Sequence, residues 1–113
     1  MIEISPLSVV HPNAKIGSDC FIGPFCTIGE HVEIGARTFL KSHVVIEGCT
    51  TIGEDCVIYP FVSLGIDSQD QKHIRDSVTY TRIGDRSTLR EFVSVHSGTE
   101  AGSAQKLGMI VPF

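Results

Sequence analysis

Three polar residues in the second half of the sequence have the side-chain types that would bind a phosphorylated sugar. Asp70 and Lys72 lie in one polar stretch, and His96 follows later in the chain. A lysine supplies a cation for phosphate, a histidine can gain or lose a proton near neutral pH, and a carboxylate accepts hydrogen bonds from hydroxyl groups. The pattern predicts a polar cleft where the stretch meets His96. A solvated loop without a ligand would have the same composition, so that alternative stays open.

A six-residue repeat must position these side chains. From Ile4 to Leu64 an aliphatic residue recurs every six positions, eleven times without a miss, and the spacing resumes at Ile83. Six residues hold only a short strand and a turn, so three units form one coil of eighteen residues with parallel strands. The repeat predicts an all-β parallel β-helix of about five coils. The expected interior columns include Ile16, Ile34 and Ile52, and next to them Ile22, Leu40 and Ile58.

Two further positions of the repeat carry a pattern. The residue after the aliphatic is glycine in seven of fourteen hexads, which we expect where the backbone turns a corner. The fourth residue after the aliphatic is small or β-branched in every hexad, which suits a narrow interior. The chain has no tryptophan and only eight aromatic residues, so aliphatic side chains are expected to fill the core.

The repeat is interrupted once, between Leu64 and Ile83, where the step is 19 residues instead of six. Segment 66–82 is therefore predicted to leave the coil as an external loop, and it contains two of the three candidate residues, Asp70 and Lys72. Insertions in solenoids often lie on the binding face, although a tolerated surface insertion is the alternative. We expect a β-helix over residues 1–108 and a divergent tail over 109–113.

The four cysteines are expected to be reduced thiols in the interior. No C-x-x-C motif occurs, and three of the cysteines occupy the small position of the repeat. Cys20 and Cys56 share a column two coils apart, roughly 9 to 10 Å, which exceeds the Cα separation of a disulfide.

The five histidines raise the possibility of a zinc site, because some β-helix hydratases bind zinc through three histidines. In those enzymes two ligands lie five residues apart on one coil, and no such pair occurs here. His43 and His96 could serve as ligands in an oligomer, but histidines on the surface or in a groove are the expected arrangement, and no metal site is assigned. The histidines are His11, His31, His43, His73 and His96.

Several segments resemble one family of hexapeptide-repeat enzymes. They are Ile22-Gly23-Pro24-Phe25-Cys26, Val32-Glu33-Ile34-Gly35, Leu40-Lys41-Ser42-His43-Val44-Val45-Ile46, Ile58-Tyr59-Pro60-Phe61, Gln69-Asp70-Gln71-Lys72, Ile83-Gly84-Asp85-Arg86, Leu89-Arg90-Glu91 and His96-Ser97-Gly98-Thr99. Over about residues 9–108 the sequence is similar to the N-terminal part of the acyl-[acyl-carrier-protein]–UDP-N-acetylglucosamine O-acyltransferases.

This resemblance implies a left-handed β-helix and a cytoplasmic homotrimer. The family moves a 3-hydroxyacyl chain from acyl carrier protein to the 3-hydroxyl of UDP-N-acetylglucosamine, the first step of lipid A biosynthesis, without a cofactor or metal. The family residues that match Asp70, Lys72 and His96 help to hold the sugar nucleotide or the acyl donor, and Gln69 lies beside them.

The resemblance also limits what is expected of these 113 residues. The family's general-base histidine lies in a later H-x-A-H-D-C-like segment that does not occur in this sequence, so no catalytic residue is assigned and the chain alone is expected to be inactive. The family's helical C-terminal domain is expected to be absent, and Ser97 stands where the family commonly has arginine. A non-catalytic binding or assembly module, another hexapeptide acyltransferase and, last, a zinc hydratase are the alternatives.

The charge and composition of the sequence exclude further classes of function. Nine basic and thirteen acidic residues give a net charge of −4, so no basic field favours nucleic acid. The longest stretches without charge are about half the length of a membrane span. The N-terminus lacks the cationic start of a secretory signal, so we expect a cytoplasmic protein with a single small domain.

Overall fold

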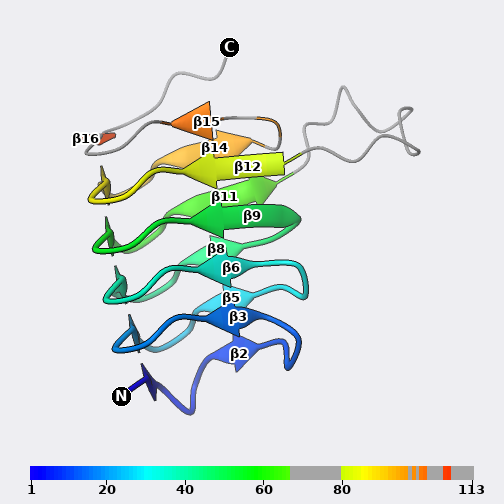
Figure 1. The fold of residues 1–113 in the computed structure, drawn as a ribbon, viewed down its shortest axis with the longest axis vertical. Coiled ribbons are helices and arrows are strands. Elements are labelled where there is room, and N and C mark those ends of the chain that lie inside the picture. The colour runs from blue at the N-terminus through cyan, green and yellow to red at the C-terminus, as the bar shows by residue number, and fades with distance from the viewer. Residues whose placement is uncertain (67–79, 97, 99, 102–105, 108–113) are drawn as a thin grey trace.

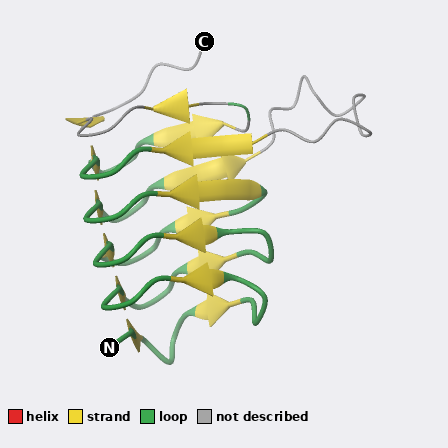
Figure 2. Ribbon diagram, viewed as in Figure 1, coloured by secondary structure: helices red, strands yellow, loops and turns green. Residues whose placement is uncertain are grey.

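The computed structural model describes residues 1–66, 80–96, 98, 100–101 and 106–107. Within these ranges the chain consists of short strands and turns, without a helix (Figure 2). The described part therefore contains no helix that could cross a membrane.

Three parallel sheets form the sides of a coil in which each sheet receives one strand per turn (Figure 1). Sheet A contains β1 (Glu3–Ile4), β4 (Phe21–Ile22), β7 (Phe39–Leu40), β10 (Val57–Ile58), β13 (Thr88–Leu89) and β16 (Lys106–Leu107). Sheet B contains β2 (Val9–Val10), β5 (Thr27–Ile28), β8 (Val45–Ile46), β11 (Ser63–Ile66) and β14 (Ser94–His96). Sheet C contains β3 (Lys15–Ile16), β6 (Glu33–Ile34), β9 (Cys49–Ile52), β12 (Tyr80–Ile83) and β15 (Glu100–Ala101).

The strand register confirms the repeat that the sequence predicts. Ile16 pairs with Ile34 and Ile34 with Ile52, eighteen residues apart, as expected for three hexads per coil. The register continues across the interruption, because Ile52 pairs with Ile83 on the far side of it. Five coils are complete, and β16 begins another.

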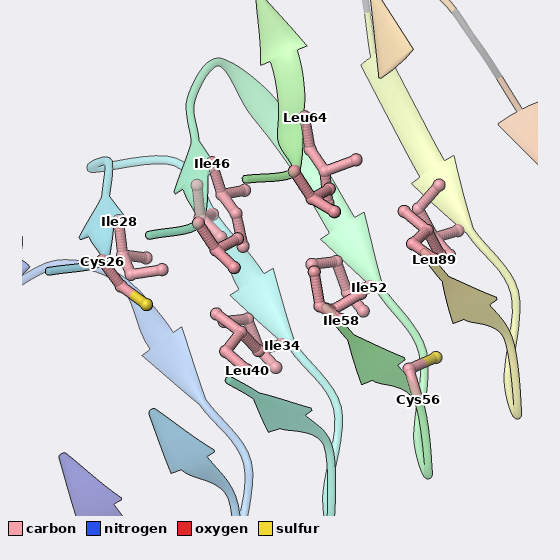
Figure 3. Packing of buried hydrophobic residues seen from close by; sticks show 14 of the residues in the cluster. Cys26, Ile28, Ile34, Leu40, Ile46, Ile52, Cys56, Ile58, Leu64 and Leu89 are labelled. Carbon is pink, nitrogen blue, oxygen red and sulfur yellow. The ribbon is translucent and has the colours of Figure 1, made fainter. Parts of the chain in front are cut away.

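The interior is a column of aliphatic side chains. In most strands the first residue faces outward and the second is buried, and the buried residues of successive coils lie one above another (Figure 3). The ends of the core columns differ from the middle, since Ile4 is 42 % exposed while Leu40 and Ile58 are fully buried. A narrow prism has no room for aromatic rings, and none of the buried core residues is aromatic.

The small position of the repeat has a second role as a hydrogen-bond donor between coils. Ser8 Oγ donates to the carbonyl of Gly23 at 2.6 Å, and Thr38 Oγ1 donates to the carbonyl of Gly53 at 2.8 Å. The thiol of Cys20 makes the same contact with the carbonyl of Gly35. Each of these three donors satisfies the carbonyl fifteen residues later, whereas Val32 and Val44 at the same position of the repeat only fill the core.

The reason for the repeat's glycines differs from the expectation. We expected them where the backbone turns a corner, but of the seven only Gly65 has a positive φ, and Gly23 does not. A Cβ on Gly23 would lie 1.6 Å from the carbonyl oxygen of Lys41 in the next coil. Close approach between coils, rather than backbone freedom, excludes a side chain there.

Left-handed backbone occurs instead two residues after the repeat's glycine position, at side chains other than glycine. At the corner between sheets C and A the residues are Asp19, Arg37, Asp55 and Arg86, which we call the charged ladder. At the corner between sheets A and B they are Phe25, His43, Phe61 and Phe92, which we call the aromatic ladder. Backbone hydrogen bonds between coils hold this conformation, for example from Arg37 N to Ser18 O at 2.8 Å.

The interruption is shorter than the predicted loop 66–82. Ile66 is the last residue of β11, and β12 already begins at Tyr80. Tyr80 and Thr81 pair with Cys49 and Thr50, so the sheet extends into the polar segment. Thr81 is buried at the level of Thr50 and fills the small position of this coil. The repeat had indicated Ser68 for that position, and Ser68 lies outside the described residues.

Candidate functional site

Of the four predicted site residues, the structure describes His96. It is the last residue of β14 and pairs with Ile66, the last residue of β11. Gln69, Asp70 and Lys72 lie outside the described residues. The register therefore places His96 beside Ile66, the last described residue before the segment that carries the other three.

A bulge at Gly65 produces this pairing. The register between β11 and β14 shifts there, so that Leu64 pairs with Val95 but Ile66, not Gly65, pairs with His96. Gly65 has a φ of 75°, and a Cβ on it would lie 2.1 Å from the carbonyl oxygen of Glu47. Glycine is therefore required here by both conformation and space.

His96 is half-buried, and its Nδ1 atom is fully shielded from solvent. No group in the described part of the chain donates to or accepts from Nδ1. A buried polar atom without a partner is uncommon in proteins.

A shallow groove on sheet C was missed by the sequence reasoning. It has a volume of about 350 Å³ and is lined by Asn13, Lys15, Glu30, His31, Val32, Glu33, Cys49, Thr51 and Tyr80. Asn13 Nδ2 donates to Glu30 Oε2 at 3.2 Å, and His31 Nε2 lies 3.7 Å from Glu30 Oε1. Its outward positions Lys15, Glu33 and Thr51 are eighteen residues apart, a spacing that could have revealed this face in advance.

The cysteines are free thiols, as predicted, and three of them are buried. Burial raises the pKa of the Cys26 thiol and of the Cys56 thiol, because the charged form would be desolvated. Such thiols stay protonated at neutral pH and are poor nucleophiles. The buried thiols fill space in the core, and those of Cys20 and Cys56 donate hydrogen bonds to backbone carbonyls.

The histidines do not gather in the described ranges. No group of three or more His, Cys, Asp or Glu side chains there is arranged to hold a metal ion. His43, one of the two considered as ligands in an oligomer, belongs to the aromatic ladder and packs between Phe25 and Phe61.

Comparisons with known proteins agree on the family. The model of the GMPPB C-terminal domain matches residues 4–107. The acyl-[acyl-carrier-protein]–UDP-N-acetylglucosamine O-acyltransferase of Thermodesulfovibrio yellowstonii is 42% identical over 102 residues, which are 90% of this chain and 39% of that protein.

Solved structures of UDP-N-acetylglucosamine acyltransferases have the same fold. The enzyme of Acinetobacter baumannii superimposes with a TM-score of 0.86 at 37% identity, over 94% of this chain and 43% of its own. That of Bacteroides fragilis gives a TM-score of 0.86 at 31% identity over 94% of this chain and 44% of its own. These matches confirm the predicted left-handed parallel β-helix.

The chain spans less than half the length of these relatives. By these matches the chain belongs to the family described as the GMPPB C-terminal domain, and it is a homologue of the N-terminal region of the UDP-N-acetylglucosamine O-acyltransferases.

Proposed function

We propose that this chain binds UDP-N-acetylglucosamine and the 3-hydroxyacyl group of acyl carrier protein, as part of an O-acyltransferase of the first step of lipid A biosynthesis. The enzyme would be a cytoplasmic homotrimer and would need no cofactor. The support is the family membership, with 42% identity to a curated acyltransferase and TM-scores of 0.86 to solved ones.

The observation that carries the proposal is the shielded, unpartnered Nδ1 of His96. Leaving a buried polar atom without a hydrogen bond costs about 1–3 kcal/mol, which a bound hydroxyl or phosphate oxygen would recover. Neutral imidazole offers one donor and one acceptor nitrogen, so it can fix the orientation of a sugar ring. In this proposal Gln69, Asp70 and Lys72 complete the contacts, with Lys72 facing a phosphate.

The chemistry proposed for these residues is binding and orientation. Transfer of an acyl group from a thioester requires a base to take the proton of the attacking sugar hydroxyl. We assign no residue of this sequence to that task, because the H-x-A-H-D-C-like segment of the family does not occur in it. The 113-residue chain is expected to bind the sugar nucleotide without catalysing the transfer.

Titration of the isotopically labelled chain with UDP-N-acetylglucosamine, followed by NMR, tests the proposal. The imidazole signals of His96 should shift in a saturable way. The ligand-induced shifts of the backbone amide signals should be lost in His96→Ala but should persist in His11→Ala, a control in a distant coil. UDP alone should shift fewer signals, since it lacks the sugar hydroxyls.

Two outcomes would contradict parts of the proposal. Saturation without any change at His96 would remove this residue from the binding site, and no binding at all would favour a non-catalytic assembly module. Acyl transfer by the chain alone, measured with acyl carrier protein as donor, would contradict the assignment of binding without catalysis.

A further inference from the structure

We propose that the groove on sheet C binds an uncharged saccharide of one or two pyranose rings. The groove is separate from His96, which lies on sheet B in a later coil, so this binding goes beyond the proposed function. Its volume is about 350 Å³, and its lining comes from β3, β6 and β9, from the turns before them and from the start of β12. These strands lie one above another along one side of the prism (Figure 1).

Two columns of side chains form the walls of the groove. The first column consists of register partners on successive strands, namely Lys15, Glu33 and Thr51. The second lies two positions earlier in the chain and ends at the register partner of Cys49, so it consists of Asn13, His31, Cys49 and Tyr80. Side chains two positions apart on a strand lie about 7 Å apart on one face, and neighbouring strands are ~4.8 Å apart. The groove is therefore about as wide as one pyranose ring, and it spans three coils.

The chemistry of this face is not imposed by the repeat. On sheet B the first residue of each strand is uncharged, as at Val9, Thr27, Val45 and Ser63. The same position on sheet C carries an ammonium, a carboxylate and a hydroxyl on three successive strands. Lysine donates hydrogen bonds, glutamate accepts them and threonine does both. Because each sugar hydroxyl also donates and accepts, neighbouring hydroxyls of one ring can pair with neighbouring strands.

The polar groups of the groove are available and partly held in place. Lys15 and Glu33 are register partners, but neither side chain forms an ion pair or a hydrogen bond with the described residues. The carboxylate of Glu30 is oriented by Asn13 Nδ2 at 3.2 Å and lies 3.7 Å from His31 Nε2. A carboxylate has about four acceptor positions, so Glu30 retains positions for a ligand hydroxyl. An acceptor that is already oriented loses little freedom when a ligand binds.

Charge and shape favour a sugar without phosphate. Glu30 and Glu33 against Lys15 give the lining two negative charges and one positive charge, with His31 neutral, so a nucleotide or a sugar phosphate is repelled. Lys15 likewise repels an organic ammonium ion. Tyr80 is 67% exposed at one end of the groove, where its ring offers an apolar face to the C–H groups of a pyranose and its hydroxyl a hydrogen bond.

Titration of the isotopically labelled chain with glucose and with cellobiose, followed by NMR, tests the inference. The backbone amides of Asn13, Glu33 and Thr51 should shift in a saturable way, with a millimolar Kd because the groove is shallow. Glu33→Gln should raise the Kd about fivefold by weakening a hydrogen bond, and Tyr80→Ala about tenfold by removing the ring.

Two matched controls separate the groove from the rest of the surface. Glu3→Gln changes the same position of the repeat on sheet A, and Tyr59→Ala removes a tyrosine outside the groove, so both should keep the Kd of the chain. UDP should leave the amides of the groove unshifted. His96→Ala should bind cellobiose as the chain does, whatever its effect on the sugar nucleotide.

Several outcomes would overturn the inference. These are the absence of saturable shifts with either sugar at about 100 mM, which is far above a millimolar Kd, or an unchanged Kd in both folded groove variants. Displacement of cellobiose by putrescine at a lower concentration would assign the groove to organic cations instead. Loss of cellobiose binding in His96→Ala would place the sugar at His96, which would overturn the separate site and leave the proposed function standing.

The thiol of Cys49 provides a measurement that needs no variant, in case Glu33→Gln or Tyr80→Ala does not fold by circular dichroism. Cys49 lines the groove, so a bound sugar should shield it from a thiol reagent. Cellobiose at about ten times its Kd should slow the reaction of Cys49 about tenfold, whereas glycerol at the same viscosity should not. An unchanged rate with cellobiose would overturn the inference.

Discussion

Thr38 Oγ1 lies 2.8 Å from the carbonyl oxygen of Gly53 in the next coil and donates a hydrogen bond to it. Thr38 Oγ1 also accepts a hydrogen bond from the backbone N–H of Cys56 at 3.3 Å. Thr38 is fully buried, so its hydroxyl joins the backbone of successive coils inside the core.

Replacement of this hydroxyl by a methyl group should destabilise the fold. Thr38→Val keeps the shape but leaves a buried carbonyl and N–H without a partner, which costs about 1–3 kcal/mol. Thr38→Ser keeps the hydroxyl and is the matched control. Urea unfolding should give a lower midpoint for Thr38→Val with an unchanged slope. Equal midpoints for Thr38→Val and the native chain would show that the hydrogen bond contributes nothing net.

Two glycines at the same position of the repeat should respond differently to alanine. A Cβ on Gly23 would lie 1.6 Å from a backbone oxygen, whereas the nearest atom to a Cβ on Gly29 is 3.5 Å away. We expect Gly23→Ala to lower the free energy of unfolding by about 3 kcal/mol or to prevent folding, because backbone must move. Gly29→Ala should change it by at most about 1 kcal/mol, in the stabilising direction. Thermal or urea unfolding of both variants compares them, and similar losses would contradict close approach as the reason for Gly23.

The charged ladder should make stability depend on pH on the acidic side. The hydrogen bond and charge of Arg37 hold the pKa of the Asp55 carboxyl below its usual range. A depressed pKa in the folded state contributes stability at neutral pH, and this contribution is lost as the pH falls below about 5 toward the folded-state pKa. Asp55→Asn should therefore lose less stability than the native chain over that pH interval. Identical pH profiles of the free energy of unfolding at low salt would show that the Arg37–Asp55 pair contributes nothing to stability. High salt should reduce the difference between the two chains.

The thiols should react at two rates. Cys49 is half-buried at the groove on sheet C, while Cys20, Cys26 and Cys56 are buried. Because a thiol reagent must reach the sulfur, one thiol should react quickly in the native state and all four after denaturation. Cys49→Ser should remove the fast phase, and a fast phase that remains would show that one of the buried positions opens readily.

Much of the fold could be predicted from the sequence because the repeat is local and regular. The aliphatic residue every six positions determines which side chains face inward, and three hexads per coil determine that Ile34 pairs with Ile52. Even the resumption at Ile83 preserved the register. The small position was identified correctly, although its role as a donor to the next coil was not, because that role depends on which carbonyl lies opposite.

The site was predicted less completely. The sequence drew attention to His96, but it did not indicate that His96 pairs with Ile66 or that Nδ1 is shielded, because both depend on contacts between coils. Gln69, Asp70 and Lys72 remain predictions. A comparison of residues eighteen positions apart could have revealed the aromatic and charged ladders in advance. The six-residue repeat by itself identifies only the side chains that face the interior.

The sequence by itself determined the coil, its register and its aliphatic core, since these follow from a period that each hexad repeats. Only the tertiary structure decided where the backbone is left-handed, why Gly23 has no side chain, and which hydrogen bonds remain unmade at His96. Those features depend on contacts between residues eighteen to thirty-two positions apart, which exist only when one coil lies on the next.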